Sequence, residues 1–374
     1  MGGPVRVVGD LAGAARMLSE DPTETLVVIG PQADLDQALT FSARCRADRP
    51  AVGVILVRPV VDVTTLTKAL RAGVREVVPA GEPTALAEAC VRSRELSWRA
   101  ATGTVTVDHQ PQPEGKVVTV FSAKGGCGKT TLALNLAVGL ATSASRRVCL
   151  VDLDLAFGDI AIILQLDPAR TIVQGIGMVG HLDATGAVSL LTPYRQGMDT
   201  LLAPVEPGAA EKIPPALVTE LLTVLRRMYD FVIVDTPSQF SEHVLAAMDA
   251  SQHHVLLTTP DVPALKNLRV TLDMLDLLSY PTGIRSVVLN RSDSKVGLTT
   301  EDVERAVRSP IAARVPSSRD VPISINKGTP ITLSSPNHPV SEAIVQFASQ
   351  HLLGERVLAR SGGLSKLRMR RRSG

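Results

Sequence analysis

The stretch "VFSAKGGCGKTTLALNLA", residues 120–137, decides the fold. It joins an aliphatic run to a turn with three glycines and then to a helix-forming segment. A strand, a glycine-rich turn and a helix in this order let backbone N–H groups at the helix N-terminus hold phosphate oxygens. The usual pattern is G-x-x-x-x-G-K-[ST], but Ala123 stands in place of the first glycine and Lys124 adds a second lysine. The stretch therefore predicts a phosphate-binding loop that carries an additional cation.

The residues of this loop have separate predicted roles. Lys129 can reach the β- and γ-phosphates of a nucleotide, and the Thr130 hydroxyl can bind Mg²⁺. Cys127 occupies the one unconstrained position, and the glycines around it let the backbone approach the phosphates closely. The predicted cofactor-binding residues of the loop are Gly125, Gly126, Cys127, Gly128, Lys129, Thr130 and Thr131.

Two further aliphatic runs end in carboxylates. The run at 148–159, VCLVDLDLAFGD, places Asp152 and Asp154 two residues apart, so both side chains point to the same side of a strand. Two carboxylates beside a metal–phosphate centre suit water positioning and outer-shell metal contacts, and capping of the next helix is the alternative. The run YDFVIVDTP closes on Asp235 in the Walker B pattern, which predicts a carboxylate that binds Mg²⁺ through water.

A late strand, VVLNR, brings Asn290 and Arg291 to its tip. An amide offers both a hydrogen-bond donor and an acceptor, which suits the edge of an adenine base. We therefore assign both residues to nucleotide binding, with an ordinary turn as the alternative for Asn290.

The pattern of strands and helices divides the chain into domains. Residues 1–100 alternate short apolar runs with amphipathic stretches, which is typical of a small α/β unit with a parallel sheet. Its strands are expected at 5–8, 25–30, 52–57 and 75–79. A linker at 101–115 gathers Gly, Pro, Gln and Thr, and a larger, doubly wound, mostly parallel domain follows at 116–353. Its expected strands lie in the segments KVVTVFSA, RRVCLVDLD, YDFVIVDTP, HHVLLTTP and RSVVLNR.

Composition sets limits on function. Apolar residues make up 45% of the 374 residues and aromatic residues only 3%, so the core must be aliphatic, as in buried parallel strands. A net charge of +2 gives no global attraction to nucleic acid or membrane. Four cysteines without regular spacing indicate buried thiols in a reducing compartment. Neither a signal peptide nor a membrane-spanning run is recognised, so we expect a cytoplasmic protein. Peripheral contact with the inner face of the cell membrane is compatible with this expectation.

The motif KGGCGKTT, together with the carboxylates at 152, 154 and 235, resembles the deviant Walker A motif of the MinD/ParA family of P-loop ATPases. The resemblance covers about residues 116–353. It implies ATP and Mg²⁺ as cofactors, slow ATP hydrolysis, and a homodimer in which Lys124 reaches the phosphates of the partner's nucleotide. It also implies that Asp154 orients the attacking water, that Asp152 lies nearer the metal, and that Asn290 contacts the base. The catalytic residues are then Lys124, Lys129 and Asp154, and the metal-site residues are Thr130, Asp152 and Asp235.

Within the family, the chain resembles the CpaE/TadZ branch, in which a receiver-like domain precedes the ATPase. The segments at 152–168, 201–207 and 258–275 carry this likeness. It implies a role in positioning the Tad (Flp) pilus machinery, although septum-site-determining proteins share the architecture. The front domain departs from a working receiver, because LVVIG ends in Gly30, VVPAG lacks a lysine, and Asp10 is a lone acid. We interpret it as a degenerate receiver-like module for docking or dimerisation.

Two functions fit these residues. The first is an ATP-dependent spatial regulator with protein partners in a pilus or division machinery. The second is a ParA-like DNA-segregation ATPase that binds nucleoid DNA through residues such as Lys266 and Arg269. A catalytically dead scaffold is disfavoured because the loop lysines and the carboxylates are all present.

The C-terminal tail, residues 354–374, is strongly basic. Its apolar face is thin, so we expect weak, salt-sensitive membrane contact at best, with nucleic acid or no partner as the alternatives. Its basic residues between 366 and 372 are Lys366, Arg368, Arg370, Arg371 and Arg372.

Overall fold

The computed structural model describes residues 5–49, 51–62, 65–66, 68–69, 72–101, 114–294 and 297–354. The basic residues of the predicted tail and most of the predicted linker lie outside these described residues. None of the helices that the structure describes is both long and apolar enough to cross a membrane.

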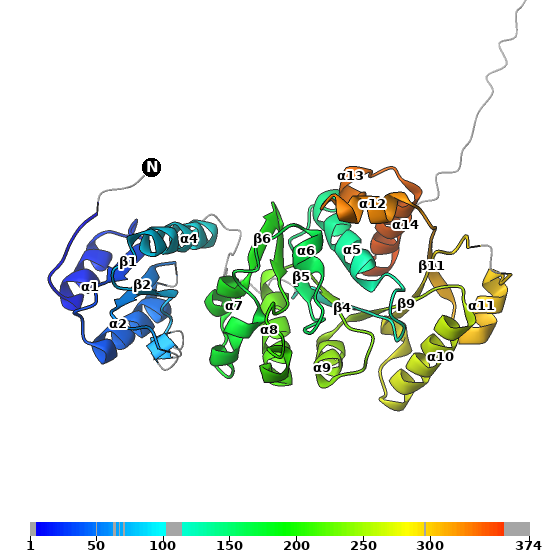
Figure 1. Ribbon diagram of the computed structural model, residues 1–374, viewed down its shortest axis with the longest axis horizontal. Helices are drawn as coiled ribbons and strands as arrows, with labels where there is room; N and C mark the ends of the chain where they lie inside the picture. Colours follow the sequence, from blue (N-terminus) through cyan, green and yellow to red (C-terminus); the bar gives the residue numbers. More distant parts are fainter. Residues whose placement is uncertain are drawn as a thin grey trace, which may run out of the picture.

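The front domain is a three-stranded parallel sheet in the order β1-β2-β3, covered by helices on both faces (Figure 1). Val54 and Leu56 pack with buried residues of α1 and α2 on one face. Ile55 packs on the other face with Val78 of β3 and Ala89 of α4. Successive side chains of β2 therefore point to opposite faces and contribute to the hydrophobic clusters on both sides of the sheet, as expected for a strand buried on both sides. The elements are α1 (Leu11–Glu20), β1 (Leu26–Ile29), α2 (Leu35–Asp48), β2 (Gly53–Arg58), β3 (Glu76–Pro79) and α4 (Pro83–Ala101).

The prediction of a strand at 5–8 was wrong, whereas the other three strands predicted in the front domain are confirmed. Residues 5–8 have no regular secondary structure, and the side chains of Val5 and Val7 are about 90% exposed. In the order 2-1-3-4-5 of receiver-type sheets, a first strand lies between the second and the third. Here β1 and β2 pair directly, from Leu26 opposite Gly53 onward, so that place is taken. The receiver-like description of this domain stays a prediction.

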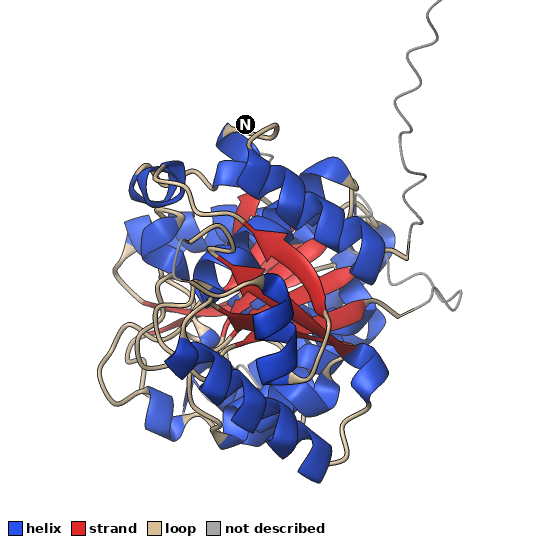
Figure 2. Cartoon of the chain, turned by 90° about the vertical axis from the view of Figure 1, so that its right-hand side faces the viewer, coloured by secondary structure: helices blue, strands red, loops and turns tan. Residues whose placement is uncertain are grey.

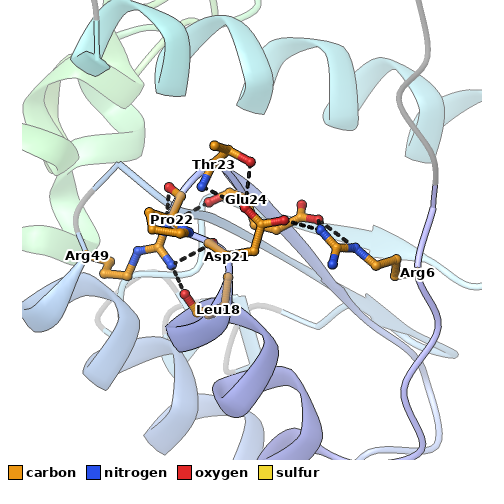
Figure 3. A network of polar contacts seen from close by, with 7 residues as sticks. All are labelled: Arg6, Leu18, Asp21, Pro22, Thr23, Glu24 and Arg49. Carbon is orange, nitrogen blue, oxygen red and sulfur yellow. Dashed lines mark hydrogen bonds and ion pairs between the residues drawn. The ribbon is translucent and has the colours of Figure 1, made fainter.

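Charged side chains hold residues 5–8 and the α1–β1 loop instead (Figure 3). The guanidinium of Arg6 pairs with Glu24 at 2.6 Å and with Asp21. Arg49 donates through Nη2 to the carbonyls of Pro22 and Glu24, at 2.8 and 3.0 Å. The alternation of Val5 and Val7 around Arg6 mimics a strand, but the direct pairing of β1 with β2 leaves no place for one between them.

The second domain contains an eight-stranded sheet in the order β11-β10-β9-β4-β8-β5-β7-β6, parallel except for β6. Figure 2 shows the strands running between helices on both sides. The strands are β4 (Lys116–Phe121), β5 (Val148–Asp152), β6 (Thr192–Arg195), β7 (Met198–Leu201), β8 (Phe231–Asp235), β9 (His253–Thr258), β10 (Arg285–Asn290) and β11 (Ile311–Val315). The helices are α5 (Lys129–Ser143), α6 (Ile160–Ile163), α7 (Ala184–Leu190), α8 (Pro215–Met228), α9 (Glu242–Ala250), α10 (Val262–Leu277), α11 (Thr300–Val307), α12 (Asp320–Asn326), α13 (Ile331–Ser334) and α14 (Pro339–Phe347).

The five expected strands of this domain are β4, β5, β8, β9 and β10, and all are confirmed. The β6–β7 hairpin and β11 were not expected, because they lie at the two edges of the sheet and are only partly apolar. One face of the sheet packs on α5, α13 and α14, and the other packs on α8, α9, α10 and α11.

The chain order reverses around β4, and this places the functional loop. β4 lies between β8 and β9, whereas the next strand along the chain, β5, pairs on the far side of β8. In open parallel sheets, ligands bind outside the carboxyl ends of the strands at such a switch point. The predicted phosphate loop leaves β4 at this position.

Candidate nucleotide site

The phosphate loop has the conformation that its glycines allow. Gly126 has φ 73° and Gly128 has φ 96°, values that side-chain-bearing residues rarely adopt. Gly128 is the N-cap of α5, so the loop leads directly into the helix N-terminus. A Cβ on Gly128 would lie 2.7 Å from Nδ2 of Asn290, so this position also needs a glycine for space.

The two lysines of the loop point to different partners. Nζ of Lys129, a largely buried residue, donates to Oγ of Ser238 at 2.6 Å. Nζ of Lys124 pairs with Oδ1 of Asp261 at 2.7 Å, and both side chains are more than a third exposed. Lys129 therefore faces the loop that follows β8, whereas Lys124 faces the loop that follows β9.

Asp152 and Asp235 are opposite each other on the neighbouring strands β5 and β8. Burial, together with the Asp235 carboxylate, raises the pKa of Asp152 well above its usual range. Burial also raises the pKa of Asp235 to about 7, although a hydrogen bond from Thr130 and the charge of Lys129 oppose this rise. Two buried carboxylates side by side repel each other, and a bound cation would remove that repulsion.

The hydrogen bonds of these carboxylates agree with a divalent cation at Asp235. Both oxygens of Asp152 accept backbone N–H groups, from Asp154 and Ile160 at 3.2 Å each. Oδ1 of Asp235 is buried and has no hydrogen-bond partner among the described residues. An orphaned carboxylate oxygen near the Thr130 hydroxyl is an oxygen-donor arrangement that suits Mg²⁺. No group of three or more metal-binding side chains occurs in the part of the chain that the structure describes.

Asp154 begins the turn that follows β5. Its Oδ1 accepts the N–H of Phe157 at 3.3 Å, so the carboxylate is held by its own loop. A Cβ on Gly158 would lie 2.7 Å from Oδ2 of Asp152 and 2.3 Å from the Cβ of Ala203. The loop therefore packs tightly on the buried carboxylate, and Gly158 permits that approach.

Asn290 and Arg291 contact the backbone of the phosphate loop. Nδ2 of Asn290 donates to the carbonyl of Cys127 at 2.7 Å, and Nη2 of Arg291 donates to that of Gly126 at 3.3 Å. Oδ1 of Asn290 accepts the N–H of Arg291 at 3.0 Å. These contacts place both residues at the site, and the predicted contact of Asn290 with the base stays a prediction. Thr131 lies in the first turn of α5, where its carbonyl accepts Nδ2 of Asn135.

A pocket of about 320 Å³ opens beside the loop. Sequence reasoning missed Asp261, Ser238 and Thr259, which bond to the loop side chains or line the pocket. Their positions could have indicated them, because each residue follows the carboxyl end of β8 or β9, where ligands of parallel sheets bind. The lining residues are Lys124, Gly125, Gly126, Cys127, Thr259, Pro260, Asp261, Arg291 and Ser294.

A doubly wound sheet, a glycine-rich loop at its switch point and a Walker B aspartate define a P-loop nucleoside triphosphatase. The ParA family model, described as an NUBPL iron-transfer P-loop NTPase, matches residues 114–352, more than half of the chain. The chain belongs to the MinD/ParA family of P-loop NTPases, as the sequence resemblance predicted.

Similar proteins agree with this assignment. The septum site-determining protein MinD of Thermotoga maritima is 29% identical over 252 residues, which are 65% of this chain and 90% of that protein. A ParA family ATPase from Chlorobium tepidum has a TM-score of 0.59 at 24% identity, covering 62% of this chain and 98% of that one. MinD of Pyrococcus horikoshii, complexed with Mg-ADP, has a TM-score of 0.56 at 22% identity. The match covers 63% of this chain and 95% of that one. The MinC:MinD complex of Aquifex aeolicus contains a chain with a TM-score of 0.55 at 22% identity. The match covers 65% of this chain and 98% of that one.

Proposed function

We propose that this chain is a Mg²⁺-dependent ATPase that dimerises around ATP and positions a protein machinery in the cell, with hydrolysis resetting the dimer. One observation carries the proposal. Lys124 is the additional cation of the phosphate loop, yet its ammonium group is paired with Asp261 at the rim of the pocket, while Lys129 is the buried lysine of the loop.

A second lysine at the same phosphates gains little within one subunit, because like charges repel each other. A lysine that is partly exposed at the pocket rim can instead leave Asp261 and reach a nucleotide in a facing subunit. There it would neutralise charge that develops during phosphoryl transfer, much as an arginine finger does. The dimer would then be the catalytic unit, and its lifetime would follow the state of the nucleotide.

The remaining residues have roles that fit this chemistry. Backbone N–H groups of the loop and the ammonium of Lys129 bind the β- and γ-phosphates. Thr130 and Asp235 would hold Mg²⁺, which supplies charge neutralisation between the phosphates when bound. Asp152 fixes the loop after β5 through two backbone hydrogen bonds. Asp154, which starts that loop, orients the attacking water.

The machinery to be positioned is inferred from the relatives. The Thermotoga maritima relative is a septum site-determining protein, and the Aquifex aeolicus structure is a cell division complex with MinC. These names support a protein partner for the dimer, and the CpaE/TadZ resemblance favours a pilus-assembly partner over a septum-associated one. The tail suggests weak contact with the inner face of the membrane, although its basic residues are outside the described ones.

DNA segregation is the second candidate, and one observation weakens it. Arg269 forms an ion pair with Asp273 and donates through Nη1 to the carbonyl of Val307 at 3.0 Å. A guanidinium engaged in this way contributes less to phosphate binding than a free one. Of the two cations proposed for nucleoid binding, only Lys266 is left exposed.

Paired lysine variants test the proposal. Lys129→Ala should abolish ATP binding in a fluorescent-nucleotide titration, because the phosphates lose their cation within the subunit. Lys124→Ala should still bind ATP but should stay monomeric in light scattering with ATP and Mg²⁺, and should hydrolyse ATP poorly. Normal ATP-dependent dimerisation and turnover of Lys124→Ala would refute the role in the partner's site.

A further inference from the structure

Arg58 is a buried arginine at the carboxyl edge of the front-domain sheet. It is the last residue of β2 and is only 8% exposed. Its Nη1 donates to the carbonyl of Ala33 at 2.6 Å and to that of Pro31 at 3.4 Å. These bonds hold the guanidinium against the loop between β1 and α2. Ligands of parallel α/β sheets bind at this edge.

The other edge of the same guanidinium lacks partners. Nε and Nη2 are both shielded from solvent, and neither has a hydrogen-bond partner among the described residues. No carboxylate of the described residues forms an ion pair with Arg58 within 4 Å, which differs from the paired arginines Arg6, Arg46 and Arg92 of the same domain. A buried charge without a partner is costly, so folded proteins rarely keep one without a use.

The two free nitrogens form one complete recognition fork. In a guanidinium, Nε–H and one N–H of Nη2 lie side by side and point in the same direction. This pair matches two oxygens of a carboxylate or a phosphate group in a bidentate contact. The third nitrogen, Nη1, is occupied by the loop carbonyls and fixes the orientation of the fork.

From this geometry we infer that the front domain has a binding site for a small oxyanion, a phosphate or carboxylate group, with Arg58 as its anchor. The N-terminus of α2, a helix of 14 residues, follows directly after Ala33 and adds a favourable dipole. Asp34 and Asp36 in that turn oppose an anion, but Asp34 is engaged as the helix cap with Gln37. Charge alone would therefore give weak attraction, and the fork supplies the selectivity.

Both free nitrogens are shielded from solvent, so an anion reaches them only when a segment that covers this edge moves. The cation at this edge has the opposite charge to a phospho-acceptor carboxylate. The site would bind an oxyanion reversibly and would not accept a phosphoryl group covalently.

The test uses the full chain with saturating ADP and Mg²⁺, so that the phosphate loop of the second domain is occupied. The protein is labelled with ¹⁵N-arginine, and the Nε–H resonance of Arg58 is identified by its loss in Arg58→Lys. Inorganic phosphate and acetate are titrated separately. We expect a saturable shift of this resonance, and the arm that saturates at the lower concentration identifies the class of oxyanion. No shift with either anion at tens of millimolar would overturn the proposal.

Thermal unfolding separates a ligand role from a structural one. In anion-free buffer, Arg58→Met should lose less stability than Arg75→Met, because the loss of its two carbonyl bonds is offset by removal of an unpaired buried charge. With ADP and Mg²⁺ saturating in both proteins, adding the anion should raise the unfolding temperature of the wild type but not that of Arg58→Met. The matched control is Arg75→Met, since the half-buried Arg75 donates to Ser93, Ser97 and Ala51. It should lose stability and still respond to the anion.

Two outcomes of that comparison would refute the site. One is an equal anion response in the wild type and Arg58→Met. The other is an Arg58→Met variant that loses as much stability as Arg75→Met in every buffer. The readouts follow Arg58 itself, so they are independent of whether the second domain dimerises or hydrolyses ATP.

Discussion

Nζ of Lys124 lies 2.7 Å from Oδ1 of Asp261, the residue that caps α10. Burial opposes ionisation of Asp261, but hydrogen bonds from Lys124 and Thr259 outweigh it, so the pKa of Asp261 lies below its ordinary value. The ion pair holds the additional lysine within its own subunit. If Lys124 serves the partner's nucleotide, this contact must break before the dimer is complete, so its strength opposes dimerisation.

Asp261→Asn should therefore favour the ATP-bound dimer. Asparagine keeps a side-chain oxygen for the cap on Ala264 but removes the charge that holds Lys124. Both side chains are more than a third exposed, and pairs of that exposure contribute at most about 1 kcal/mol. We expect the dimer to form at an ATP-dependent dissociation constant up to about fivefold lower, measured by sedimentation over a concentration series.

Asp273→Asn is the matched control for this change. Asp273 lies on the same helix and pairs with Arg269, away from the phosphate loop. Its variant should dimerise as the wild type does. Weaker dimerisation of Asp261→Asn would instead mean that Asp261 helps to build the interface.

Asp154→Ala should bind ATP and Mg²⁺ normally while hydrolysing ATP about 100-fold more slowly, so that the dimer accumulates. A water-orienting group acts mainly in the transition state and contributes little to nucleotide binding. Light scattering with ATP, beside a single-turnover assay, measures both effects. The control is Asp159→Ala on the same loop, because Asp159 makes no capping hydrogen bond. A purely monomeric Asp154→Ala, or equal rates in the two variants, would contradict the role.

The strand–loop–helix around residues 120–137 could be predicted because its requirements are local. Gly126 and Gly128 must adopt positive φ, and Lys129 follows at the helix start, so a short pattern carries the whole element. The buried strands of the second domain were equally visible, because parallel strands covered on both faces appear as continuous aliphatic runs. Asp152 and Asp235 end two such runs, and the sheet brings them opposite each other.

Other features depend on contacts between distant segments and have no local signature. The pairing of Lys124 with Asp261 joins residues 137 positions apart, and Asn290 contacts Cys127 across 163 positions. Residues 5–8 show the opposite error. Their alternation satisfies the local rule for a strand, but the direct pairing of β1 with β2 leaves no place between those strands. Edge elements such as β6 escaped prediction because only part of their surface is buried.

Gly158→Ala should slow hydrolysis without removing the nucleotide site. A Cβ at this position would lie 2.7 Å from Oδ2 of Asp152, so the loop that carries Asp154 must shift. A displacement of this kind at a catalytic group typically costs about 100-fold in rate. The control is Gly283→Ala, where a Cβ meets nothing within 4 Å. The measurement is the hydrolysis rate beside ATP affinity, and an unchanged rate in Gly158→Ala would show that the loop tolerates the shift.

Stability in mild acid should depend on His253 at the start of β9. Burial, with the nearby charges of His351, His254 and Lys116, lowers the pKa of His253 to about 4, against an ordinary value of about 6.5. Between these two values the unfolded chain binds a proton that the folded chain does not. The free energy of unfolding should therefore fall as the pH decreases from about 6.5 to 4, by roughly 3 kcal/mol from this residue, and should change no further from this cause below pH 4.

His253→Gln removes this proton uptake, while its amide can still bond to Oγ of Ser286, which the ring contacts at 2.9 Å. Urea unfolding of the wild type and the variant at a series of pH values gives the test. The difference between their free energies of unfolding should be constant above about pH 7 and should shift in favour of the variant toward pH 4. His254, whose pKa is also lowered by burial, keeps some acid sensitivity in the variant. Parallel curves over the whole range would mean that His253 takes up its proton equally in the folded and unfolded chains.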